Sequence, residues 1–147
     1  MLVQTVRFGE LEIKDTSIIH FVSPILGFEE ERKFVFIPSS DEDSHFIYLQ
    51  SIEDANLAFV LADPFPFYTG YEFDIEDKWI QKLKLDAKED VEIRVVTTVR
   101  SPQDISVNLK APIIINRKNN DAAQIILDNS RYTTRHSLFS NPSQGGE

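Results

Sequence analysis

The sequence predicts a mainly β fold, an antiparallel β-barrel-like single domain with one principal helix. Short runs of β-branched and aromatic residues recur along the chain, and clusters of turn residues separate them. Only one segment repeats its apolar residues with a helical period. The 147 residues are the length of one ordinary domain. We expect this domain to span residues 1–139, followed by a flexible polar tail at 140–147.

Regular spacing of many short strands is typical of a closed or sandwich-like antiparallel sheet. The connections are mostly short, which favours pairing of sequential neighbours in a meander. Turn residues at Arg117–Asp121 predict a β-hairpin. The expected strands are Leu2–Phe8, Glu10–Ile13, Ser17–Phe21, Phe34–Pro38, His45–Gln50, Leu57–Ala62, Val91–Val99, Ile105–Leu109, Pro112–Asn116, Ala123–Leu127 and Tyr132–Thr134.

The principal helix is expected to follow Asp74, whose side chain is suited to cap a helix N-terminus. Its apolar face is formed by Ile75, Trp79, Ile80 and Leu83. We expect this helix to cover one opening of the barrel. A shorter helical turn is expected at Pro24–Phe28.

Cysteine is absent, which excludes disulfides, thiolate metal sites and a cysteine nucleophile. The first residues lack the basic start and apolar run of a secretory signal. Apolar stretches such as Leu57–Ala62 are far shorter than the roughly 20 residues that span a bilayer. These features predict a cytoplasmic protein that does not enter the membrane.

Acidic residues outnumber basic ones by 24 to 15, which gives a net charge of -9. The imbalance is uneven, because residues 1–74 contain 14 acids and 4 bases whereas residues 75–147 contain 10 and 11. A field of this sign repels phosphate backbones, so direct nucleic-acid binding is not expected. Two interpretations of the acidic first half stay open: attraction of a basic partner, or simple solubility.

Residue patterns of the common catalytic sites are missing. Only Gly9, Gly27 and Gly70 lie in the expected folded part, so no glycine-rich phosphate loop can be written. The three histidines lack the spacing of metal ligands, and paired carboxylates such as Glu53-Asp54 lie in polar turns. We therefore predict no catalytic residue, no cofactor, no metal and no enzymatic activity.

The segment Asp63–Tyr71 is unusual because two prolines alternate with aromatic residues. Its rings either cap the core beneath a long loop or form a surface for a partner, since interfaces are enriched in aromatic residues. The sequence leaves both interpretations open.

Four segments together resemble the FliW family of flagellar assembly factors. They are Ile25-Leu26-Gly27-Phe28-Glu29, Phe46-Ile47-Tyr48-Leu49-Gln50-Ser51, Phe59-Val60-Leu61-Ala62-Asp63-Pro64 and Val107-Asn108-Leu109-Lys110-Ala111-Pro112-Ile113. The resemblance runs from the first strand to about Leu138. One departure is the turn before Gln124, where such a protein is expected to have a glycine and this chain has Asn119-Asn120-Asp121-Ala122-Ala123.

The resemblance implies a β-barrel-like protein that binds two protein partners, flagellin and the translational repressor CsrA. Binding CsrA would relieve its repression of flagellin mRNA. Newly made flagellin would draw the factor away in a chaperone-like complex, and its export would release the factor. The free protein is expected to be a monomer.

The candidate partner-binding residues rest on charge and ring arguments and are not transferred from the family. We expect them to form one acidic and aromatic surface. They are Glu29, Glu30, Glu31, Asp41, Glu42, Asp43, Tyr48, Glu53, Asp54, Asn56, Phe65, Phe67 and Tyr68.

Two other classes of protein remain as alternatives. A small-ligand-binding β-barrel would keep a hollow interior, which the 11 phenylalanines disfavour. An oligonucleotide-binding barrel would use a positive groove. The basic residues available for such a groove are Arg94, Arg100, Lys110, Arg117, Lys118, Arg131 and Arg135.

Overall fold

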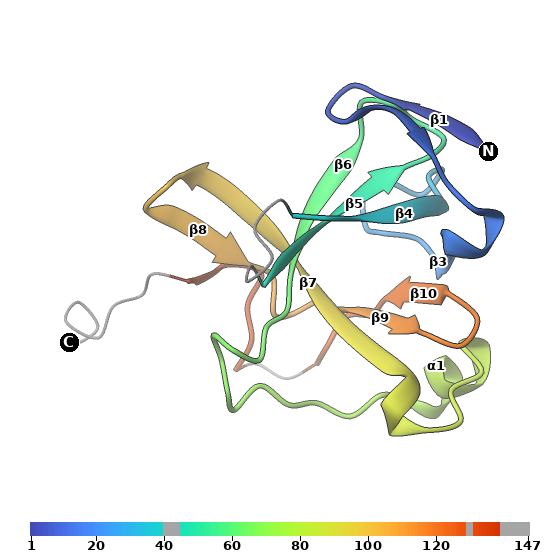
Figure 1. Cartoon of the computed structure of the whole chain (residues 1–147). Coiled ribbons are helices and arrows are strands. Elements are labelled where there is room, and N and C mark those ends of the chain that lie inside the picture. Colours follow the sequence, from blue (N-terminus) through green and yellow to red (C-terminus); the bar gives the residue numbers. More distant parts are fainter. Residues whose placement is uncertain (40–44, 129–130, 139–147) are drawn as a thin grey trace.

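The computed structural model describes residues 1–39, 45–128 and 131–138. A two-stranded sheet contains β1 (Leu2–Thr5) and β2 (Gly9–Glu12), and a nine-stranded sheet forms the body of the molecule (Figure 1). Its strands are β3 (Ile18–Ser23), β4 (Lys33–Pro38), β5 (Phe46–Ser51), β6 (Ala58–Ala62), β7 (Val91–Ser101), β8 (Asp104–Val107), β9 (Ile113–Asn116), β10 (Asp121–Gln124) and β11 (His136–Ser137). The helical elements are α1 (Asp77–Lys82) and the 3-10 turns η1 (Asp15–Ser17) and η2 (Lys88–Asp90).

Strand β7 closes the sheet because it pairs with three other strands. Its first residues pair with β9, its middle with β6 and its last residues with β8. The strand order is β11-β8-β7-β6-β5-β4-β3-β10-β9, and the additional β7–β9 pairing turns most of it into a ring. The predicted mainly β, barrel-like single domain is confirmed. Beyond the ring, β8 and the end of β7 project to one side (Figure 1).

The meander is confirmed from β3 to β8, where each strand pairs with the next along the chain. It is wrong between β8 and β9, which are not neighbours in the sheet. Strand β10 pairs with its neighbour β9 and also, in parallel, with β3, with Asp121 opposite His20. The hairpin between β9 and β10 is present, and Asn120 in its turn has φ of 62°. Asparagine tolerates this left-handed conformation, so it supplies the geometry expected of a glycine.

Two clusters of buried side chains fill the interior. One contains Phe34, Leu49, Leu61 and Ile113, each with no exposed surface. The other contains Val95, Ile114, Ala123 and Leu83 among its members. Burying a side chain of this size contributes about 1.5–3 kcal/mol. This filled interior argues against the ligand-binding barrel.

Helix α1 is shorter than predicted and begins later. The N-cap position is Glu76, whose backbone carbonyl accepts hydrogen bonds from Trp79 and Ile80. Asp74 therefore lies in an extended segment before the helix and does not cap it. At Pro24–Phe28 the chain makes a turn instead of a helical turn, with Gly27 at φ of 87°.

Strand ends near the C-terminus also differ from the prediction. Strand β10 ends at Gln124, although Ile125 and Leu127 still donate backbone hydrogen bonds to Pro112 and Lys110. The expected strand at Tyr132–Thr134 is absent from the described residues, and β11 follows it instead. Residues 140–147 lie outside the described residues.

Asn116 joins α1 to the sheet. Its side chain is 1% exposed, and its Nδ2 donates hydrogen bonds to the carbonyls of Leu83 (2.7 Å) and Lys84 (3.1 Å). Its Oδ1 accepts one from the backbone N–H of Lys118 at 2.9 Å. Because Lys84 has φ of 57°, the chain turns sharply there, and the amide satisfies carbonyls at the helix end.

We expect Asn116→Ala to lower the free energy of unfolding by about 2–4 kcal/mol, because buried carbonyls lose their donors. Urea unfolding of the variant and the parent measures this difference. Asn119→Ala is the matched control, since Asn119 makes one exposed hydrogen bond to Asp121. A loss of less than 1 kcal/mol at Asn116 would contradict the assigned role.

Candidate protein-binding surfaces

Two acidic turns lie side by side at one end of the sheet. Strand β5 ends where β4 begins, with Ser51 opposite Phe34, and the N–H of Ile52 donates to the carbonyl of Lys33 at 3.0 Å. This pairing brings the turn before β4 next to the turn after β5. We call the resulting surface the acidic end; it consists of Glu29, Glu30, Glu31, Glu53 and Asp54.

Glu53 holds the two turns together. Its Oε1 accepts hydrogen bonds from the backbone N–H groups of Arg32 (2.8 Å) and Lys33 (3.2 Å). The hydroxyl of Ser51 accepts from the N–H groups of Glu53 and Asp54, which fixes the turn after β5. The carboxylate of Glu53 therefore has a structural role, although its side chain is exposed.

The remaining carboxylates of the acidic end are more available. Glu29 accepts from the N–H of Gly27 at 3.0 Å, and Asp54 accepts from that of Asn56 at 2.9 Å. The side chains of Glu30 and Glu31 make no hydrogen bond with any described residue. Within the same described ranges, no carboxylate of the acidic end is within ion-pair distance of a lysine or arginine. The carboxylates of the acidic end thus have no ion-pair partner among the described residues.

The candidate aromatic residues lie at the opposite end of the sheet. Strand β6 ends at Ala62, which pairs with Phe46 at the start of β5, and the aromatic segment follows directly. A strand the length of β5 spans about 17–20 Å. The structure therefore does not bring Phe65, Phe67 and Tyr68 beside the acidic end. The candidate residues Asp41, Glu42 and Asp43 lie outside the described residues.

Most rings of this segment turn toward the protein. Phe67 packs against His45 and Phe46, with centroids 5.6 and 5.9 Å away. Tyr68 packs on His136, and its hydroxyl donates to the carbonyl of Ser137. Phe65 is 39% exposed. The geometry favours a capping role for Phe67 and Tyr68 and leaves Phe65 as the ring of these three most open to a partner.

Tyr48 is half-buried in the middle of β5, under the turn between β1 and β2. The Phe8 ring meets it edge-on at 5.1 Å, and the Arg7 guanidinium lies 5.2 Å from its centroid. The N–H of Val6 donates to the carbonyl of Ala55 at 2.9 Å, so the same turn also contacts the residue that follows Asp54.

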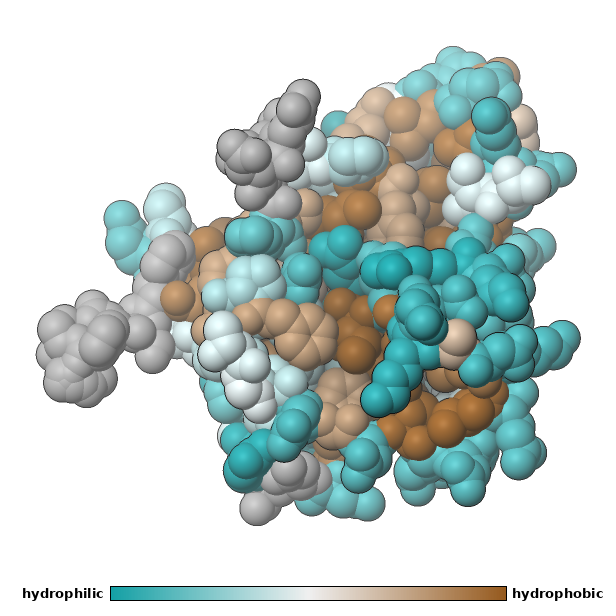
Figure 2. All heavy atoms as spheres, turned by 60° about the horizontal axis from the view of Figure 1, so that its bottom comes forward, coloured by the Kyte–Doolittle hydropathy of each residue, from teal (hydrophilic) through white to brown (hydrophobic). Residues whose placement is uncertain are grey.

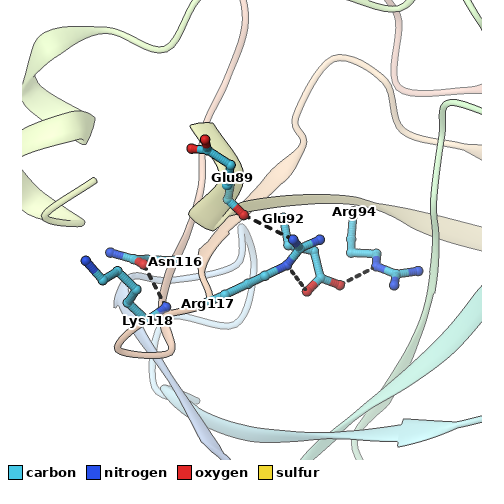
Figure 3. A network of polar contacts seen from close by, with 6 residues as sticks. All are labelled: Glu89, Glu92, Arg94, Asn116, Arg117 and Lys118. Atoms are coloured by element: carbon cyan, nitrogen blue, oxygen red, sulfur yellow. Dashed lines mark hydrogen bonds and ion pairs between the residues drawn. The ribbon is translucent and has the colours of Figure 1, made fainter. Parts of the chain in front are cut away.

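Several basic residues of the second half form ion pairs with acidic residues of the same chain. Figure 3 shows Glu92 between Arg94 and Arg117, at 2.7 and 3.5 Å. Lys118 lies within 4.0 Å of Asp86 and Asp90. These ion pairs weaken the positive groove that an oligonucleotide-binding barrel would need.

The sequence did not indicate a surface groove of about 480 Å³ between the extended residues 72–76 and residues 125–128. Ile126 in its wall is 54% exposed. The sequence pattern predicts a helix cap at Asp74 and a strand at Ile125–Leu127, and neither prediction indicates a groove. Figure 2 views the molecule from the lower side of Figure 1, and apolar side chains form patches there, bordered by hydrophilic ones.

Within residues 1–39, 45–128 and 131–138, no group of three or more histidine and carboxylate side chains is arranged to hold a metal ion. No helix in those ranges is long and apolar enough to cross a membrane.

The fold and its surfaces define a small barrel-like protein that presents charged turns and a groove around a filled core. The model of the family "FliW protein" matches residues 2–138. The flagellar assembly factor FliW of Bacillus subtilis (strain 168) is 45% identical over 139 residues, covering 94% of this chain and 96% of that protein. That of Geobacillus kaustophilus is 39% identical over 140 residues, covering 95% and 96%.

A crystal structure of the flagellar assembly factor FliW superposes with a TM-score of 0.88 at 37% identity, covering 96% of this chain and 99% of that one. The chain belongs to the FliW family of flagellar assembly factors. This assignment confirms the resemblance found in the sequence, and it agrees with the prediction that the chain is not an enzyme.

We expect Glu53→Ala to lower the free energy of unfolding by about 1–2 kcal/mol, because two backbone N–H groups lose a charged acceptor. Glu30→Ala is the matched control and should stay within about 0.5 kcal/mol of the parent. Denaturant unfolding compares the three proteins. Equal stabilities would show that Glu53 does not hold the turns together.

Stability is expected to depend on pH through His136. Burial lowers the pKa of His136, and its Nε2 accepts the N–H of Thr133 at 2.9 Å. The imidazole of His136 therefore takes up a proton more readily in the unfolded chain than in the folded protein. The contribution of neutral His136 to stability is complete above the unfolded pKa of about 6.5. It is lost as pH falls through the folded pKa. The unfolding free energy of His136→Gln should therefore fall less than that of the parent between pH 7 and 5. Parallel curves would contradict this.

Proposed function

We propose that this protein binds CsrA and relieves its repression of flagellin mRNA, and that it alternatively binds newly made flagellin. The observation that carries the proposal is the FliW family match, which runs from residue 2 to residue 138. The protein would act in the cytoplasm, where both translation and newly made flagellin are found. Matching flagellin synthesis to export would be the outcome of this exchange of partners.

The acidic end gives the proposal a physical basis. CsrA must be basic where it holds RNA, and complementary charge increases association rates. An acidic protein docked beside that surface also repels the phosphate backbone, so inhibition does not require covering the RNA site. Glu30 and Glu31 suit this role, because their carboxylates form no ion pair or hydrogen bond with any described residue.

The rigidity of the acidic end supports binding as well. The guanidinium of Arg32 donates to the carbonyls of Glu29 (3.2 Å) and Phe21 (3.1 Å), which anchors the turn to β3. The ring of Phe28 packs edge-on against Phe59 at 5.0 Å, which anchors it to β6. A turn held in one conformation loses little entropy when a partner binds.

Calorimetric titration with purified CsrA, repeated after saturation with flagellin, tests the exchange. We expect tight binding to CsrA that flagellin weakens. Absence of heat with both partners, confirmed by gel filtration, would contradict the proposed function.

The electrostatic part is tested with the double variant Glu30→Lys and Glu31→Lys. We expect slower association with CsrA, on the order of tenfold at low salt, and a smaller effect at high salt, where charges are screened beyond about 3 Å at 1 M. Glu10→Lys is the control, because Glu10 is an exposed acid on β2 outside the acidic end. Association rates measured by stopped flow that do not differ from the control would remove Glu30 and Glu31 from the interface.

A further inference from the structure

The groove between residues 72–76 and 125–128 has an open sheet edge in its wall. Residues 125–128 continue the antiparallel pairing of β10, with the N–H groups of Ile125 and Leu127 donating to residues 112 and 110. Hydrogen-bonding groups alternate sides along a strand, so the N–H and C=O of Ile126 point away from residues 110–112. Neither group has a hydrogen bond to any described residue.

Strand β3 covers this edge along β10 but ends before it reaches Ile126. Strand β3 pairs with β10 only as far as Ser23 opposite Ala123. Pro24 follows, and the positive φ of Gly27 turns the chain away. The last contact is the N–H of Leu26, which donates to the side chain of Gln124 at 2.8 Å. The edge beside Ile126 is therefore left open.

The opposite wall of the groove also has backbone groups without hydrogen bonds to described residues. Residues 71–76 have no regular secondary structure, and Phe73, Asp74 and Ile75 make no backbone hydrogen bond with any described residue. The segment is held at its start by Tyr132, whose hydroxyl accepts from the N–H of Glu72 and donates to its carbonyl, both at 3.1 Å. It leads into α1 at its end. Two fixed chain segments with unpaired backbone groups thus flank the groove.

The side chains around the groove specify the chemistry of an occupant. Its acids are Glu72, Asp74, Glu76 and Asp128, and its base is Arg131. Arg131 is turned onto Tyr132, with its Nη2 donating to the hydroxyl at 2.8 Å and the guanidinium 5.2 Å from the ring centroid. Phe73 and Ile126 add apolar surface. A basic and apolar segment complements this combination.

We propose that the groove binds an extended segment of a protein partner with alternating basic and apolar side chains, and that its backbone pairs with Ile126. Addition of a strand to an open edge supplies affinity through backbone hydrogen bonds and specificity through alternate side chains. The inference rests on the proposed function in that the partner is CsrA or flagellin. The polar sequence at residues 141–147 lacks basic residues, so this chain's own tail is a poor match.

Ile126→Pro tests the backbone pairing. Proline removes an N–H that has no partner in the described protein and keeps Ile125 extended, so the internal hydrogen bonds remain. The probe is an end-blocked octapeptide of alternating lysine and valine, with a glutamate and valine octapeptide as control. We expect the parent to prefer the basic peptide. We expect Ile126→Pro to bind it about fivefold more weakly, which is the effect of one backbone hydrogen bond.

A second variant keeps the test independent of folding in the proline variant. Asp74→Lys combined with Asp128→Lys should reverse the preference toward the acidic peptide. Glu10→Lys on β2 should leave it unchanged. Equal binding of the two peptides by the parent, or binding of neither, would overturn the proposal.

The same variants separate this proposal from the proposed function. If CsrA and flagellin bind the parent and all groove variants equally, the groove proposal fails and the function stands. If neither protein binds the parent but the groove variants lose the basic peptide, the function fails and the groove stands. Sedimentation that showed a dimer of the parent and a monomer of Ile126→Pro would assign the groove to a second copy and overturn the choice of partner.

Discussion

The fold depends on one strand that is long enough to take part in three pairings. Val91 to Arg94 of β7 pair with β9. The middle of β7 pairs with Val60 to Ala62 of β6, and the last residues of β7 pair with β8. Without the β7–β9 pairing the sheet would be an open ribbon with both core clusters exposed along a seam. Because β7 begins directly after η2, this closure also fixes the position at which the preceding segment ends.

This architecture distributes its surfaces over different parts of the molecule. Antiparallel pairing of β4, β5 and β6 places acidic turns at one end and the aromatic segment at the other. The acidic end is stiffened by hydrogen bonds between charged side chains and the backbone, which are stronger than bonds between neutral groups. The aromatic segment is stiffened by ring packing instead. The acidic end and the aromatic segment are thus each held in place by contacts with the strands next to them.

The sequence was sufficient for elements that depend on local patterns and insufficient for those that depend on distant contacts. Alternation and turn residues located β3 to β6, and Gly27 has the positive φ that its place in a turn requires. Asp74 looked like a helix cap because its local surroundings suit one, but α1 begins only after Glu76. The other end of α1 is held by Asn116, which lies 33 residues from Leu83 in the sequence. The groove could not be found either, since it exists only when residues 72–76 meet residues 125–128.

The short strand β11 has a consequence for self-association. It pairs with the outer side of β8 through His136 and Ser137, and the N–H of Leu138 continues the pairing to Ile105. Uncovered edges of projecting hairpins are templates on which further chains add, and Val99 nearby is 55% exposed. Two residues of strand thus cover the outer edge of the projecting β7–β8 hairpin (Figure 1). Proteolysis before residue 136 would remove β11 and leave the outer edge of β8 open to pairing with other chains.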